Sequence, residues 1–195
     1  MNHLIKNTLF LYLLLTFKGV YAGQYVSDDD LEQLRTTKSC MKCDFSYSTI
    51  KQWNVHFESL VSNSSFTGAF IDSSNFRGSD FSGCTLTRLK VLNTLLVQSN
   101  FSNARMQYIV FNNVQLSGSK LVNAQLQNAN LSYTNLSSVD FTGANTQGVI
   151  FDHALLIGSN ITIAQLNRAK SLSCAVMPDG TVYPANKNDK CDLGL

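Results

Sequence analysis

The sequence is short of charge and of proline. Only 14% of its 195 residues are Asp, Glu, Lys or Arg, against about 25% in an ordinary soluble domain. Because 44% of the residues are hydrophobic, the low charge does not indicate disorder, which goes with low hydrophobicity and high net charge. It argues against an ordinary helical domain, whose solvent face is rich in Lys, Glu and Arg. The two prolines exclude a proline-rich linker. Asn, Ser, Thr and Gln fill the polar positions, so we expect a repetitive β architecture with an uncharged polar surface.

The N-terminal segment 1–22 has the layout of a secretory signal peptide. Lys6 supplies a positive charge, residues 9–17 (LFLYLLLTF) are almost wholly apolar, and small residues precede a cut after Ala22. An uncleaved membrane anchor is the alternative, but a spanning helix needs about 20 apolar residues, and only 11 positions separate Lys6 from Lys18. We therefore predict a periplasmic or secreted protein with no membrane insertion once residues 1–22 are removed.

Export leaves the remaining chain without net charge. Residues 1–22 hold two lysines and no acids, so the 15 basic and 13 acidic residues of the whole sequence become 13 of each. A neutral protein has no electrostatic footprint for nucleic acid or for an anionic membrane. We therefore expect no nucleic-acid partner.

A period of five residues runs through most of the chain. In steps of five from Phe66 to Leu166, 20 of 21 positions hold a large apolar residue, and only Thr146 departs. A helix repeats apolar residues near 3.6 and a strand near 2, so neither explains this pattern. The position two before each centre is small or slim, apart from the bulky Leu89 and Ile109. The small residues there include Ala69, Ser74, Ser79, Cys84, Ala104, Ala124, Ala129, Ala144, Ala154 and Ala164.

The period fits a chain in which each pentapeptide forms one side of a square coil. The large centre and the small residue two before it point inward, and the other three positions face water. Four sides make a coil of about 20 residues, and stacked coils pair their backbones at about 4.8 Å. Several glycines share the slot two after the centre, where the chain must turn: Gly68, Gly78, Gly83, Gly118, Gly143 and Gly158.

The sequence resembles the pentapeptide-repeat family, whose pattern is Ala-(Asp/Asn)-Leu-X-X. Residues 129–133 (ANLSY) and 139–143 (VDFTG) carry the resemblance, which extends from residue 64 to about 170. It implies an all-β fold, a right-handed quadrilateral parallel β-helix, here a solenoid of about five to six coils.

We expect an N-terminal cap and a C-terminal cap around the solenoid. Residues 23–44 form the first, with a short helix over residues 27–34 that Ser27 caps and that covers the open edge of the first coil. Residues 172–195 form a C-terminal capping tail with a turn at residues 177–181. The β-helix itself occupies residues 64–171.

Residues 45–63 are predicted to form an irregular first coil or a loop. The centres Phe45, Ile50, Val55 and Leu60 step by five, but the next step, to Phe66, is six. Trp53 and Glu58 are too large for the inward slot, so residues 51–63 should leave the regular wall. An imperfect capping coil is typical of solenoids. A projecting site made of Trp53, His56 and Phe57 is the functional alternative.

Five cysteines suit an exported protein, which can keep disulfides. Cys84 falls in the small inward slot and should be a buried free thiol. We predict a Cys174–Cys191 disulfide that fastens the tail. Cys40 and Cys43 form a tight disulfide, a redox pair or two reduced thiols. A zinc site shared by both pairs would need four ligands on one ion, and the length of the rod argues against it.

The sequence offers no catalytic constellation and no sign of a cofactor or metal. Its mature part has two histidines, His56 and His153, and its glycines recur at multiples of five rather than as a phosphate-binding loop. The acids inside the repeat stand beside centres, where the repeat prefers Asp or Asn. We predict a protein that is not an enzyme and infer no small-molecule substrate.

A protein partner or a second copy could bind two adjoining faces of the solenoid. Residues one coil apart stack on one face, and contiguous exposed apolar surface often marks an interaction site. In the alternative, residues 88–97 (RLKVLNTLLV) bulge and bury their own leucines. The outward apolar residues of the two faces are Phe70, Leu92, Val110, Tyr133 and Ile150, followed by Leu95, Val97, Leu155 and Ile157.

These features favour a non-catalytic exported scaffold or interaction module, such as a component of an envelope or secretion assembly. A secreted effector that acts on a host partner has the same signature. The resemblance suggests a further alternative, because some members of the family mimic B-form DNA and inhibit DNA gyrase. That mimicry needs a strongly acidic rod, whereas residues 45–171 hold five acids and eight basic residues.

Overall fold

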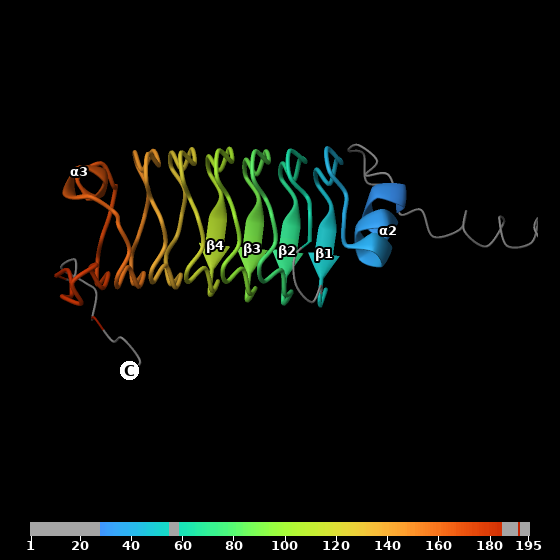
Figure 1. Cartoon of the computed structure of the whole chain (residues 1–195). Coiled ribbons are helices and arrows are strands. Elements are labelled where there is room, and N and C mark those ends of the chain that lie inside the picture. Colours follow the sequence, from blue (N-terminus) through green and yellow to red (C-terminus); the bar gives the residue numbers. More distant parts are fainter. Residues whose placement is uncertain (1–27, 55–58, 185–190, 192–195) are drawn as a thin grey trace, which may run out of the picture.

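The structure, a computed structural model, describes residues 28–54, 59–184 and 191 (Figure 1). The predicted signal peptide, residues 1–22, and the predicted helix cap Ser27 lie outside these residues, as do His56, Phe57 and Glu58. The described elements are α2 (Asp28–Thr37), β1 (Thr49–Lys51), β2 (Phe70–Asp72), β3 (Lys90–Leu92), β4 (Val110–Asn112) and α3 (Ile163–Leu166).

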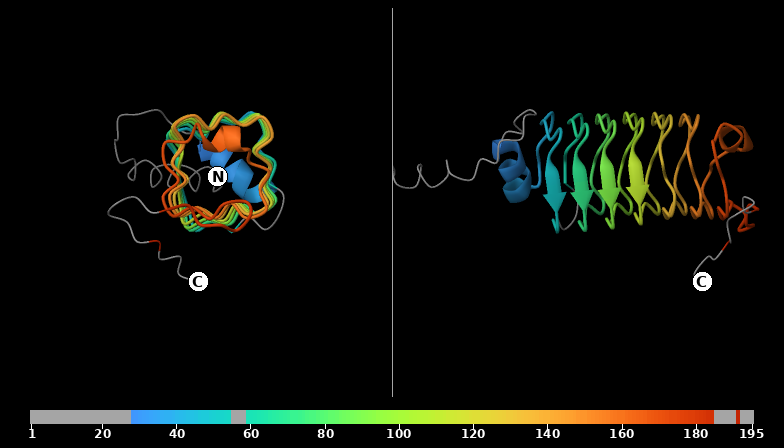
Figure 2. Two further views of the ribbon diagram at one scale, coloured as in Figure 1. Left: turned by 90° about the vertical axis from the view of Figure 1, so that its left-hand side faces the viewer. Right: turned by 180° about the vertical axis from the view of Figure 1, so that it is seen from behind.

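Four short strands stack along one wall of a solenoid. β1 to β4 form one parallel sheet in the order β1-β2-β3-β4, with Phe70 opposite Lys90 and Lys90 opposite Val110. On the other walls, isolated parallel bridges repeat the pairing at the same interval, as from Gln115 to Asn135. Viewed end-on, the stacked coils share a four-sided outline (Figure 2). Parallel pairing at this interval is consistent with a β-helix solenoid.

The large residues of the fivefold series fill the interior. Every centre from Phe66 to Leu166 is buried, including Thr146, whose hydroxyl donates a hydrogen bond to the Gln165 carbonyl at 2.7 Å. Phenylalanines of successive coils stack, and the rings of Phe81 and Phe101 lie 5.0 Å apart. The bulky exceptions in the small slot, Leu89 and Ile109, are also buried. The interior therefore accommodates these larger side chains while the chain keeps its register.

The corner slot two after each centre from Phe66 to Leu156 has positive φ, with or without glycine. Asn123, Asn128 and Tyr133 take this conformation, at φ 56°, 59° and 56°. Stacking favours glycine at particular corners. Gly148 lies against Asn128, and a Cβ there would stand 2.5 Å from the Asn128 Oδ1 atom. The glycine therefore leaves room for the side chain of the coil before it.

The first coil follows the wall more closely than its sequence indicated. Lys51 ends β1, and Asn54 bridges to Asn75, so residues 51–54 stay in the wall. Trp53 is half-buried against the core. The prediction that Leu60 is an inward centre is wrong: Leu60 is 45% exposed, whereas Val61 is fully buried.

The register of the bridges locates the irregularity. Asn54 pairs with Asn75, an interval one position longer than that of the regular coils, where Leu60 pairs with Asp80. The bridges from Ser39 and Asp44 have the same longer interval as Asn54. The first coil therefore holds one extra residue, which lies between Asn54 and Leu60.

α2 covers the end of the core at the first coil (Figure 1). It spans Asp28–Thr37, three residues beyond the predicted end, and buries Leu34 completely. The Asp30 carboxylate accepts a hydrogen bond from the Asp44 N–H at 3.1 Å. In later coils the equivalent N–H bonds to the coil before it, as Ser65 does to the Cys43 carbonyl. The Asp30 carboxylate therefore takes the place of the carbonyl acceptor that a preceding coil would supply at this edge.

At the other end the wall continues past the predicted boundary at residue 171. Ser171 pairs with Ile150 and Val176 with Leu155, again at an interval one position longer than that of the regular coils. The chain then turns at residues 177–181, as predicted, where the Met177 N–H donates to the Thr181 carbonyl, and Val182 pairs antiparallel with Val176.

α3, which the sequence analysis did not predict, accounts for the extra residue of this coil. Thr162 and Gln165 form a reciprocal capping box, and the Gln165 amide also donates to the Phe141 carbonyl at 2.7 Å. The prediction that Ala164 points inward is wrong, because the helix leaves Ala164 exposed.

Candidate interaction surface

The nine outward apolar residues all reach the surface. None is buried: six are half-buried, and Leu95, Tyr133 and Ile157 are 42%, 57% and 47% exposed. Backbone hydrogen bonds to a neighbouring coil hold each of the nine, so their positions are fixed by the wall rather than by a loop. Fixed apolar side chains on a rigid wall are suited to binding a complementary protein surface.

The stretch from residue 88 to 97 does not bulge. β3 lies within it and pairs in register with β2 and β4. Leu89, Val91 and Leu96 point inward, while Leu95 stays exposed and Leu92 half-buried. The alternative in which this stretch buries all its own leucines is therefore wrong.

Polar residues separate the nine apolar residues along the columns of the wall. On the β-strand wall, Lys90 stands between Phe70 and Val110, and Asn130 stands between Val110 and Ile150. On the adjoining wall, Gln115 and Asn135 separate Leu95 from Leu155. No two of the nine are paired along one column of these bridges. Polar residues therefore stand on both sides of Phe70, Val110 and Ile150 along their shared column.

A small recess lies beside Tyr133 and Leu155, at the corner where the two walls meet. The Tyr133 and His153 rings stack with their centroids 4.6 Å apart and an angle of 7° between their planes. The Asn135 amide donates to the Gln115 side chain at 3.0 Å. The recess measures about 260 Å³ and is lined by Asn113, Gln115, Tyr133, Thr134, Asn135, His153 and Leu155.

This recess joins an aromatic pair to amide groups, a surface that can receive a polar or aromatic side chain of a partner. Tyr133 belongs to the predicted interaction face, whereas His153 has no predicted role. Their equivalent positions in successive coils were the signal that the two rings stack.

The carboxylates of the repeat serve the wall itself. The Asp80 carboxylate accepts hydrogen bonds from the Ser82 N–H and the Asn100 amide, both at 3.0 Å. Asp140 accepts from Thr142 and Asn160, and these hydrogen bonds, led by that of the Thr142 hydroxyl, lower the pKa of Asp140. These acids hold turns and neighbouring coils together, which is the work that asparagine does at equivalent positions.

The cysteines divide between the two ends and the interior. Cys40 and Cys43 are disulfide-bonded with Cα atoms 5.7 Å apart, and Cys174 and Cys191 are bonded with Cα atoms 5.1 Å apart. Cys84 is a buried free thiol that donates to the Val61 carbonyl, and burial raises the pKa of Cys84 to about 12.

The model for pentapeptide repeats matches residues 59–88, 94–132, 109–145 and 134–170, more than half of the chain. The chain belongs to the pentapeptide-repeat family. Pentapeptide-repeat proteins are generally non-enzymatic scaffolds. A comparison with curated protein sequences finds no match.

Three solved pentapeptide-repeat proteins show how loosely the chain matches individual structures. A protein of the Arabidopsis thaliana thylakoid lumen is 25% identical over 56% of this chain and 68% of its own, with a TM-score of 0.38. Rfr23 of the cyanobacterium Cyanothece is 18% identical over 64% and 98%, with a TM-score of 0.35. HetL of Nostoc, a protein involved in heterocyst differentiation regulation, is 16% identical over 74% and 91%, with a TM-score of 0.32.

The described residues include no helix that is both long and apolar enough to cross a membrane.

Proposed function

We propose that this pentapeptide-repeat protein is a non-enzymatic exported scaffold or interaction module, placed in an envelope or secretion assembly. One observation carries the proposal: nine apolar side chains project from two adjoining walls whose backbone is fixed by pairing between coils. The occupant is a protein, either a partner or a second copy. As part of the same proposal, the solenoid is a right-handed quadrilateral β-helix of about five to six coils, the hand that parallel crossover connections favour.

Two features support export. Residues 1–22 have the composition of a signal peptide, and four of the five cysteines are paired as disulfides, which persist in oxidising compartments. A fusion of alkaline phosphatase to Leu195 tests the location, because the enzyme is active only after export. We expect activity that is lost when residues 1–22 are deleted. An inactive fusion that accumulates in the cytoplasmic fraction, or activity that does not depend on residues 1–22, would contradict export.

Charge substitutions on the β-strand wall test the interaction. Phe70→Asp and Val110→Asp together place two carboxylates among the projecting side chains, so they should weaken association at least tenfold. Both side chains are only half-buried, so the thermal unfolding midpoint should change little. Val122→Asp is the matched control, because Val122 is half-buried and projects from a different wall.

The measurement has two parts, which separate a second copy from another protein. Sedimentation velocity of the chain from Gly23 to Leu195 reports self-association. Crosslinking in the native envelope fraction, followed by pull-down, reports a stoichiometric partner. Association that survives the double substitution, or that Val122→Asp weakens equally, would exclude this surface.

A further inference from the structure

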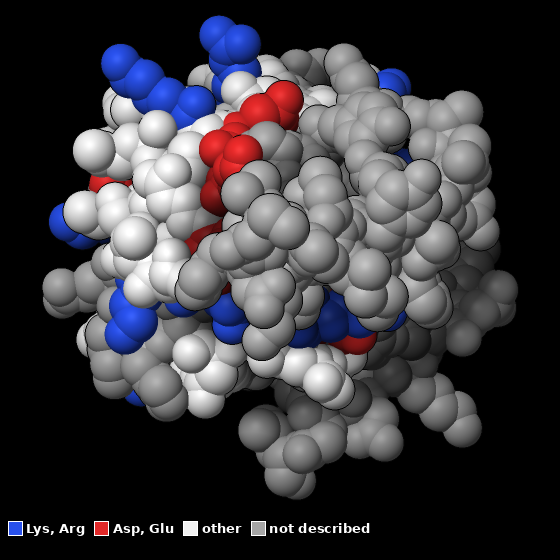
Figure 3. Space-filling view, turned by 90° about the vertical axis from the view of Figure 1, so that its right-hand side faces the viewer, with Lys and Arg blue, Asp and Glu red and all other residues white. Residues whose placement is uncertain are grey.

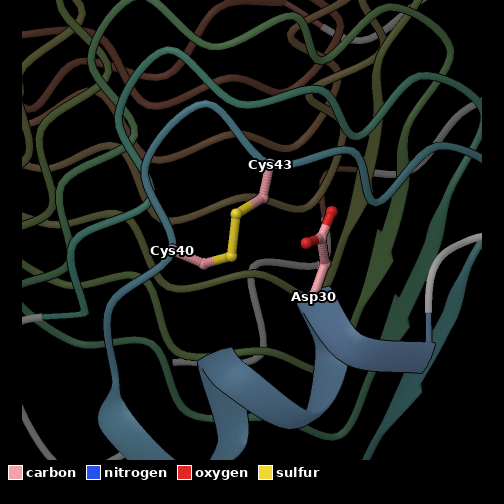
Figure 4. Close-up of side chains that lie close together, drawn as sticks. All are labelled: Asp30, Cys40 and Cys43. Carbon is pink, nitrogen blue, oxygen red and sulfur yellow. A yellow bond between two sulfur atoms is a disulfide. The ribbon is translucent and has the colours of Figure 1, made fainter.

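Asp30, Cys40 and Cys43 converge at the N-terminal end of the solenoid. The Asp30 carboxylate points from α2 toward the two sulfur atoms (Figure 4), and one oxygen of Asp30 and both Sγ atoms lie within 4.8 Å of one another. Cys40 is buried, while Cys43 and Asp30 are half-buried. Because two of the three residues are only half-buried, the group is not closed off from solvent. Figure 3 shows this end of the molecule, with acidic side chains next to one another on it.

The three side chains are held by the backbone of the first coils. Asp30 is fixed by the Asp44 N–H, which donates to its Oδ2 atom at 3.1 Å. The Ser64 hydroxyl accepts from the Cys43 N–H at 3.0 Å and donates to the Cys40 carbonyl at 2.9 Å. These contacts do not pass through the sulfur atoms. The arrangement should therefore survive opening of the disulfide.

Reduction changes the chemistry of this group. A phosphine reductant cleaves the S–S bond and becomes a phosphine oxide by taking oxygen from water, and each sulfur gains a proton. The resulting two thiols and one carboxylate lie close together, and their ionised forms repel one another unless a cation lies between them. The carboxylate makes thiolate attack on another molecule less favourable. It is also the third ligand that a Cys-X-X-Cys pair lacks.

We propose that Asp30, Cys40 and Cys43 form a thiolate–carboxylate site that binds Zn²⁺ when their disulfide is reduced. Zinc takes cysteine sulfur at about 2.3 Å and carboxylate oxygen at about 2.0–2.2 Å, and a site with three protein ligands keeps a fourth position for water. Binding displaces the two thiol protons. An ionised carboxylate has about four lone-pair positions, so Asp30 can serve Asp44 and the metal together. A zinc site shared by both cysteine pairs would need ligands from both ends of the rod, whereas all three ligands proposed here lie at its N-terminal end.

Zinc titration of the reduced chain, residues 23–195, tests the site with the metal alone as probe. The chain holds every described residue, and a phosphine keeps all cysteines reduced. Because reduction also opens the Cys174–Cys191 bond, the comparison is with the Cys40→Ser/Cys43→Ser variant, in which the other cysteines are unchanged. We expect the parent chain to bind one more Zn²⁺ than this variant. The oxidised parent should not bind the extra ion. Equal stoichiometry in the two reduced chains would overturn the proposal.

Asp30→Asn tests the carboxylate, and its exposed neighbour supplies the control Asp29→Asn. Even loss of a residue that only supports a metal ligand lowers affinity about 10- to 100-fold, so Asp30→Asn should weaken binding at least tenfold while Asp29→Asn does not. Asp30→Glu, which keeps a carboxylate, provides a second variant if Asp30→Asn fails to fold. Cobalt substitution should show thiolate-to-metal charge transfer from two sulfurs. Unchanged zinc affinity in folded Asp30→Asn would exclude the site. The test is independent of the proposed interaction function, because it measures neither export nor association.

Discussion

Three buried serines on one interior column provide a direct test of how hydrogen bonding stabilises this solenoid. Ser79, Ser99 and Ser119 occupy equivalent positions in successive coils, and each is at most 1% exposed. The Ser99 hydroxyl donates to the Phe76 carbonyl at 3.0 Å. The Ser119 hydroxyl donates to the Leu96 carbonyl at 2.7 Å and accepts from the Ser99 N–H at 3.1 Å. Among the described residues, the Ser79 hydroxyl has no hydrogen-bond partner.

Substitution of each serine by alanine should therefore give three different results. An intramolecular hydrogen bond contributes about 0.5–1.5 kcal/mol net, and an unsatisfied buried polar group costs about 1–3 kcal/mol. Ser99→Ala should lower the free energy of unfolding by about 1 kcal/mol, and Ser119→Ala, which loses a donor and an acceptor, by about 1–2 kcal/mol. Ser79→Ala removes an unsatisfied hydroxyl and should raise it by about 1 kcal/mol.

Urea unfolding followed by circular dichroism measures these changes, provided that the slope against denaturant stays constant. Thermal midpoints should move in the same order, by about 2–4 °C per kcal/mol for a chain of this size. All three substitutions remove the same atom from the same kind of slot, so differences in helix or strand propensity cancel. If Ser79→Ala destabilises the protein as much as Ser99→Ala, the reasoning from hydroxyl partners is refuted.

Three further predictions concern the core, the acids and the tail. Leu121→Ala removes a side chain that is 1% exposed and should lower the free energy of unfolding, measured in urea, by about 2–5 kcal/mol. A loss below about 1 kcal/mol would contradict the inward position of the centres. Hydrogen bonds from Thr142, followed by one from Asn160, lower the pKa of Asp140 below its ordinary value of 3.8. The ionised Asp140 carboxylate therefore stabilises the folded protein above pH 3.8, and this stabilisation is lost as the pH falls through the folded pKa. Asp140→Asn should therefore reduce the loss of stability in acid, which urea unfolding midpoints measured at several pH values would show. The same dependence on pH in Asp140→Asn and in the parent would contradict this role of Asp140. Cys174→Ala with Cys191→Ala opens a loop with a sequence separation of 17 and should cost about 3 kcal/mol; stability equal to that of the oxidised parent would show that the disulfide contributes nothing.

The fivefold pattern predicts the wall well because size alone decides which residues fit inside. The prediction of a buried Cys84 thiol needed only its place two before a centre. Leu60 failed for a related reason: the extra residue of the first coil lies before it, so the series continues from Val61, itself five before Phe66. A pattern of apolar residues alone could not choose between two adjacent apolar positions.

The C-terminal end shows a second limit of the pattern. Ala164 and Leu166 keep the spacing of the repeat, yet Thr162 and Gln165 close a capping box that begins α3. Local hydrogen bonds to free N–H groups decide the backbone there, and they override the fivefold series. The capping-box pattern Thr-X-X-Gln was present in the sequence and would have indicated the helix.

For the candidate surface, the sequence predicted which residues face outward but not that polar residues separate them. Counting apolar residues per face identified two adjoining walls as the candidate surface. Only the pairing of Lys90 with Val110, and of Gln115 with Asn135, shows that polar residues interrupt each column. The sequence contains this information, because residues one coil apart share a column, but each column has to be compared residue by residue.

The same column geometry explains how this surface can change without loss of the fold. Inward side chains and wall hydrogen bonds stabilise the coils, whereas Phe70, Val110 and Ile150 project from backbone that pairs irrespective of the side chain. Lys90 occupies the same column as these residues and pairs in the same register. A charged side chain is therefore already tolerated in the middle of the wall. It follows that substitutions along this column should change the proposed association far more than the free energy of unfolding, so the two effects can be measured separately.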